Sequence, residues 1–77
     1  MKAVLKFDAD TEEYNPDTMA KHGFKVDNNG DYFYRVFDSF ASLNEKDRVE
    51  VLGYYCLICF KYYDVESERM VYVLDVE

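Results

Sequence analysis

The chain has 77 residues, 49% of them hydrophobic and 18% aromatic, and a formal net charge of -7. This length allows one domain over residues 1–77, and the hydrophobic content excludes the composition of disordered chains. The 16 acidic residues outnumber the 9 basic ones, which excludes a basic surface for direct nucleic-acid binding.

Alternation of apolar and polar residues predicts a first strand over residues 2–7. Ala3, Leu5 and Phe7 share one face of this segment, as in a half-buried strand. An acidic segment without apolar periodicity follows it. We therefore expect a strand that ends in a loop.

Asparagine, proline and aspartate at residues 15–17 are typical of a helix N-terminus, because they suit the cap, the first helical position and the first turn. The helix is expected to run to about His22 and to end at Gly23. A short strand over 24–26 and a turn over 27–30 should follow.

The apolar residues between Asp31 and Leu43 fit both the two-residue period of a strand and the period of a helix. Polar residues at helical spacing leave Phe33, Phe37 and Phe40 on one apolar stripe, and this pattern favours a helix. Asn44 has the character of an N-cap, so a second helix is expected over 45–53, facing inward through its apolar residues and ending at Gly53.

The C-terminal third is rich in residues that favour strands. Residues 54–63 indicate a buried strand, with a helix as the alternative, because an apolar run does not reveal its period. Residues 70–76 complete a hairpin. The predicted fold is α+β: a small antiparallel sheet of the N-terminal strand and this hairpin, with two to three short helices packed on one face.

The two cysteines lie three residues apart, so they cannot connect distant segments as disulfides do in small secreted domains. Apolar neighbours surround Cys56 and Cys59, which predicts buried, unreactive thiols rather than a redox pair. The longest apolar run, 54–60, is far shorter than the ~20 residues of a membrane span. We expect a soluble, cytoplasmic protein that does not bind membranes.

Candidate metal and catalytic sites fail on their spacing. Asp27, Asn29 and Asp31 match the start of a calcium loop, but Tyr32 occupies the position that needs glycine. His22 has no nucleophile and orienting acid to pair with. We expect no metal site, no cofactor and no enzymatic activity.

The acidic residues gather in two segments and carry the functional hypothesis. If the terminal strands pair antiparallel, the turn at 64–68 lies beside the loop at 8–14, and both segments meet at one pole. The predicted partner-binding residues are Asp8, Asp10, Glu12, Glu13, Tyr14, Asp17, Asp64, Glu66 and Glu68.

This pattern predicts a small inhibitor, of the kind that phages and other viruses encode. It would dock a basic, nucleic-acid-binding surface of a partner protein. The alternative is a structural or regulatory subunit that forms homo-oligomers through exposed aromatic residues.

Overall fold

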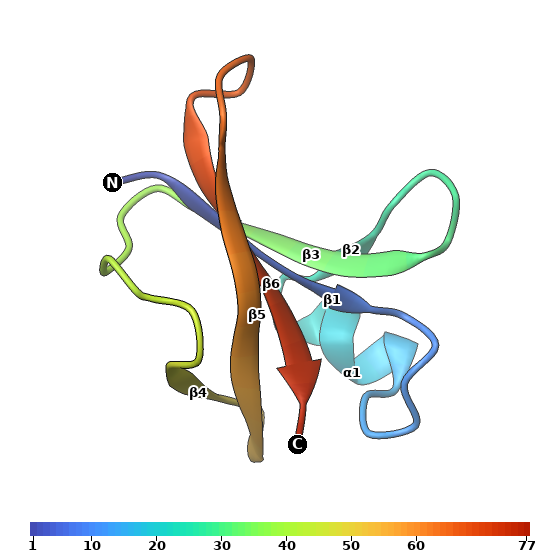
Figure 1. Ribbon diagram of the computed structural model, residues 1–77. Helices are drawn as coiled ribbons and strands as arrows, with labels where there is room; N and C mark the ends of the chain where they lie inside the picture. Colours follow the sequence, from blue (N-terminus) through green and yellow to red (C-terminus); the bar gives the residue numbers. More distant parts are fainter.

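Six strands form one mixed sheet in the computed structural model, which describes residues 1–77 (Figure 1). In chain order the elements are β1 (Ala3–Asp8), α1 (Pro16–Lys21), β2 (Lys25–Val26), β3 (Tyr32–Phe37), β4 (Arg48–Val51), β5 (Tyr54–Asp64) and β6 (Arg69–Val76). The strand order across the sheet is β2-β3-β1-β6-β5-β4. The expected small antiparallel sheet with two to three helices is wrong: the protein is mostly sheet, with one short helix.

The central pair of strands is parallel. β1 lies between β3, with which it is antiparallel, and β6, with which it is parallel. Ala3 is opposite Met70 and Phe7 is opposite Leu74, so both strands run the same way (Figure 1). The expected antiparallel pairing of the terminal strands is therefore wrong.

One cluster of twelve buried residues forms the core on the face of the sheet that α1 covers. The odd-numbered residues of β1 and the even-numbered residues of β6 supply its centre, because alternate side chains of a strand point to one face. The covering side is built by Tyr14 of the loop after β1, by Met19 of α1 and by Phe24.

The helix forms where the sequence predicts it. The Asn15 side chain accepts a hydrogen bond from the Asp17 amide (2.8 Å), Pro16 is the first helical residue, and Gly23 has φ of +85° after the helix end. A positive φ is accessible to glycine at little cost, which explains the stop. No helix here has the length and apolar composition needed to span a membrane.

Residues 31–43 do not form the expected helix. Tyr32–Phe37 is β3, hydrogen-bonded to β1 on one side and β2 on the other, and a non-helical segment follows it. Aromatic and β-branched residues favour strands, and here two neighbouring strands satisfy their backbone groups. Phe33 and Phe37 still share one face, at strand spacing. The ring centroids of Phe37 and Phe40 lie 4.9 Å apart.

The second expected helix, over 45–53, is also wrong. The Asn44 amide donates to the Asp47 carboxylate (2.8 Å) in a turn, and β4 then pairs with β5. Leu52 and Gly53 both have positive φ, at +50° and +91°. Two such residues between antiparallel strands form the tight turn of a β-hairpin, so Gly53 marks a hairpin rather than a helix end.

β5 confirms the strand expected over 54–63, but it is irregular. The pairing with β6 shifts between Ile58 and Phe60, as at a β-bulge. Cys56 is fully buried, and burial raises the pKa of its thiol. Cys59 lies within the shift and is exposed, so the expectation that both cysteines are buried is wrong for Cys59.

Candidate functional site

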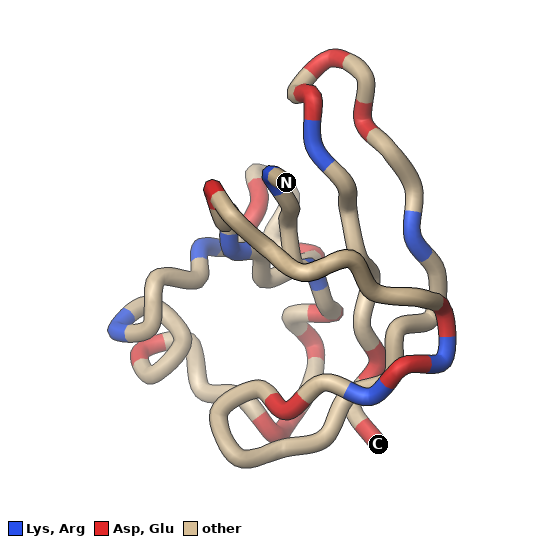
Figure 2. Tube along the Cα trace, turned by 90° about the vertical axis from the view of Figure 1, so that its left-hand side faces the viewer, with Lys and Arg blue, Asp and Glu red and all other residues tan.

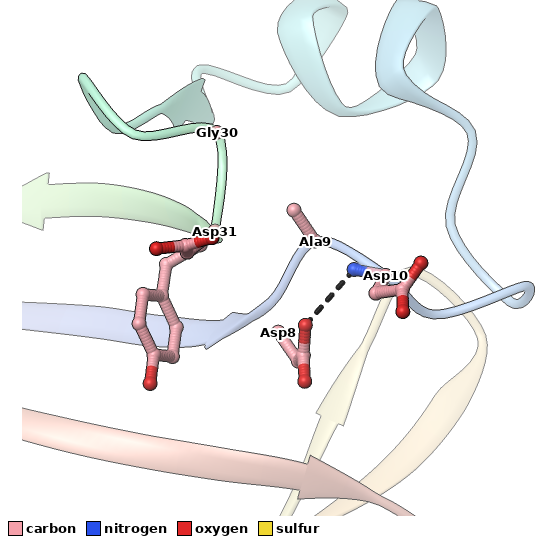
Figure 3. Close-up of a pocket in the computed structure, with 6 residues that line it drawn as sticks. Asp8, Ala9, Asp10, Gly30 and Asp31 are labelled. Atoms are coloured by element: carbon pink, nitrogen blue, oxygen red, sulfur yellow. Dashed lines mark hydrogen bonds between the residues drawn. The ribbon is translucent and has the colours of Figure 1, made fainter.

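Two hollows adjoin where β1 and β6 end. The larger, about 480 Å³, is lined by Asp8, Ala9, Asp10, Gly30, Asp31 and Tyr32 (Figure 3). The smaller, about 90 Å³, is lined by Phe7, Asp8, Thr11, Glu13, Leu74, Asp75 and Val76. Because Asp8 belongs to both, the carboxylates around them form one surface. We call it the acidic end, comprising Asp8, Asp10, Glu13, Asp31 and Asp75.

Hydrogen bonds donated by backbone amides fix the shape of the larger hollow. The Ala9 amide donates to the Asp31 carbonyl (2.9 Å), which extends the pairing of β1 and β3 by one residue. The Asp10 amide donates to the Asp8 carboxylate (3.0 Å), and the Asp31 amide donates to the Asp27 carboxylate (2.8 Å). Asp8, at the end of β1, and Asp31, just before β3, thus both line the hollow (Figure 3).

No carboxylate of the acidic end forms an ion pair, although Lys6 lies over the Tyr32 ring, 4.3 Å from its centroid. Neither hollow is lined by lysine, arginine or histidine, and the one ion pair of the protein joins Arg48 to Glu77. The Thr11 hydroxyl donates a hydrogen bond to the Glu13 carboxylate and so lowers the pKa of Glu13. The surface therefore presents free negative charge at neutral pH.

The two acidic segments of the sequence do not meet at one pole. Since β1 and β6 are parallel, the turn at 64–68 lies where β1 begins, whereas residues 8–17 follow its end. Figure 2 shows acidic stretches at the hairpin tip and, at the other end of the molecule, near the C-terminus. Asp64, Glu66 and Glu68 are thus separated from the acidic end.

The carboxylate of Asp64 also has a local role. It accepts hydrogen bonds from the Ser67 hydroxyl (2.8 Å) and the Glu66 amide (3.2 Å), and these bonds lower the pKa of Asp64. Such contacts stabilise a turn between strands. Asp64 therefore shapes the hairpin tip.

Three further predicted site residues have different surroundings. Tyr14 is only 5% exposed, and its hydroxyl donates to the Val51 carbonyl (2.8 Å), so its ring belongs to the core rather than to a partner surface. Asp17 lies in the first turn of α1, and Glu12 is exposed on the loop before the helix.

Sequence reasoning missed Asp31 and Asp75. Asp31 follows the turn between β2 and β3, and Asp75 is near the end of β6. Both lie far in the sequence from Asp8, so only the pairing of β1 with both neighbouring strands brings them to the same end of the sheet. Predicting the parallel pairing of β1 and β6 would have identified Asp75, and predicting the pairing of β1 and β3 would have identified Asp31.

The arrangement suits cationic side chains. Carboxylates accept charge-assisted hydrogen bonds from arginine and lysine, and paired oxygens bind a guanidinium in a defined geometry. No group of three His, Cys, Asp or Glu side chains is placed to hold a metal ion.

Comparisons with known proteins add no relative. The chain matches no protein-family model, no curated protein and no solved structure.

Proposed function

We propose that the protein is a non-enzymatic binding protein whose acidic end docks a basic surface of a partner protein and occludes the partner's nucleic-acid site. The observation that carries this proposal is the set of five carboxylates around two adjoining hollows without a cation. Desolvating such charges is favourable only when opposite charges replace the water. A basic surface supplies them.

A surface that binds nucleic-acid phosphates has the required chemistry. Arginine and lysine there are spaced to contact anionic oxygens, and the carboxylates of the acidic end offer similar acceptors. Complementary charge also accelerates association. The free negative charge of residues such as Asp10 and Asp31 would thus steer the protein toward its partner.

The proposal places the protein in the cytoplasm, where free thiols such as those of Cys56 and Cys59 remain reduced. Its small size and net charge of -7 agree with an inhibitor encoded by a phage or another virus.

The binding test compares two pairs of charge-neutralising changes. D10N/D31N removes two charges from the acidic end, and the matched control E66Q/E68Q removes two from the hairpin tip. A partner captured with the wild-type protein is tested for binding to labelled duplex DNA by fluorescence anisotropy. We expect the wild-type protein and E66Q/E68Q to displace the DNA equally, and D10N/D31N to need about tenfold more protein.

Added salt should weaken wild-type binding, because exposed charges are screened beyond about 8 Å at physiological ionic strength. Equal displacement by D10N/D31N and the wild-type protein would contradict the proposal. So would a captured partner that does not bind nucleic acid.

A further inference from the structure

The face of the sheet opposite the core, the open face, has no covering element. α1 lies on the core side (Figure 1). The segment between β3 and β4 lies there too, since Phe40 packs on the core residue Tyr72 and the Leu43 amide donates to the Tyr72 hydroxyl (3.1 Å). Side chains on the open face therefore contact only one another and solvent.

Strand register arranges the open face in four rows across the central strands. From the start of β1 to its end, the rows are Lys2, Arg69 and Asp64; Val36, Val4, Val71 and Tyr62; Tyr34, Lys6, Val73 and Phe60; and Tyr32, Asp8, Asp75 and Leu57. The first row holds two cations and one anion, Asp64, and the last row holds two anions. The middle rows are apolar except for Lys6.

The middle rows contain a shallow groove. Val4 and Val71 are only 7% and 6% exposed although nothing covers them, because taller side chains stand on both sides. A hollow of about 180 Å³ lies above these valines, with Tyr34 and Val36 on one side and Tyr62 on the other.

The raised side of the groove is aromatic. Tyr62 stacks on Phe60 with ring centroids 6.2 Å apart, and both residues are nearly half exposed. Valines floor the hollow, and charged residues also line it: Lys6, Asp27, Asp64 and Arg69. Exposed aromatic rings beside such a mixed hollow are typical of protein interfaces. The groove therefore has the character of a docking surface.

We propose that the open face binds a second copy of this chain, face to face, about a two-fold axis that lies between the two middle rows and crosses the strands. Such an axis places the first row of one copy over the last row of the other. Lys2 then faces Asp8 of the second copy, and Arg69 faces its Asp75. The two cations of the first row thus meet the two anions of the last row, as a two-fold interface requires, while Lys6 lies over Val4 of the second copy and Asp64 over its Leu57.

The same axis brings the aromatic residues together. Tyr62 of each copy lies over Phe60 of the other, and Val71 lies over Val73. Sheets that pack in this way align their strands to within about 30° and interdigitate their side chains.

Sedimentation equilibrium tests the dimer with two neighbouring tyrosines of similar exposure. Tyr62 (44% exposed) is on the open face, whereas Tyr63 (55%) is opposite Met70 on the core side. We expect a reversible dimer of the wild-type protein. Y62S should raise the dimer dissociation constant about tenfold or more, and Y63S by less than about twofold.

A charge exchange tests the axis itself. R69D should weaken the dimer, and R69D/D75R should restore it, because the axis brings these two positions together across the interface. Circular dichroism checks that every variant is folded. A monomer at all concentrations would overturn the proposal, as would a dimer that Y63S weakens as much as Y62S.

The dimer interface and the acidic end share Asp8 and Asp75, but their tests use different residues. The dimer test needs no partner, and D10N/D31N changes no residue of the four rows, so this variant should dimerise like the wild-type protein. Loss of the dimer in D10N/D31N would place the interface at the hollow around Asp10 and Asp31 and contradict the open-face proposal. The proposed function would still be decided by the separate DNA-displacement test.

Discussion

Replacing Phe7 by alanine should lower the free energy of unfolding by about 3–5 kcal/mol. Phe7 is 1% exposed in the central strand β1, and its ring centroid lies 4.9 Å from that of Tyr14, 5.3 Å from that of Phe24 and 6.0 Å from that of Phe33. Truncation therefore leaves a cavity among three rings that a sheet and a helix hold in place.

Phe37→Ala is the matched control, measured alongside Phe7→Ala by urea denaturation. The sequence pattern placed Phe37 on an inward helical stripe, but Phe37 is the last residue of β3 and is only partly buried. Its truncation should cost less than about half as much. Equal losses would show that the core is not centred on Phe7.

Alkaline pH should destabilise the fold through Tyr14. Burial raises the pKa of Tyr14 well above its ordinary value near 10, so at high pH the unfolded chain loses a proton that the folded protein keeps. The contribution of Tyr14 to the free energy of unfolding is then fully present below about pH 10. Above this pH it falls by about 1.4 kcal/mol per pH unit. Urea denaturation across this range measures the slope.

Tyr14→Phe is the control for the alkaline effect. It removes the titrating hydroxyl and leaves the Val51 carbonyl without the hydrogen bond it accepts, so the variant should be less stable by about 1–3 kcal/mol at neutral pH. Burial raises the pKa of Cys56 and the Tyr14 hydroxyl lowers it, so Tyr14→Phe retains an alkaline loss from Cys56 and lacks only the part that Tyr14 contributes. Parallel stability curves above pH 10 would contradict the assignment to Tyr14.

Local signals predicted the elements whose hydrogen bonds are local. The cap at Asn15, the stop at Gly23 and the hairpin of β5 and β6 were all predictable from adjacent residues. β3 was not, because its aromatic residues fit two periods, and the choice between them depends on β1, which is distant in the sequence. Tertiary pairing overrides local pattern in such segments.

The candidate site was predictable only in part, for the same reason. Asp8, Asp10 and Glu13 lie in one acidic stretch, so the sequence shows them together. Asp31 and Asp75 join them through long-range pairing. Burial of Tyr14 could not be read from its acidic neighbours, since it results from the packing of the loop under the sheet.

The parallel pairing of β1 with β6 is the central claim, because it assembles the acidic end, separates it from the hairpin tip and orders the rows of the open face. Cross-strand nuclear Overhauser effects test it directly. The structure predicts contacts of Ala3 with Met70 and of Phe7 with Leu74. Contacts of Ala3 with Leu74 and of Phe7 with Met70 would show antiparallel strands and contradict it.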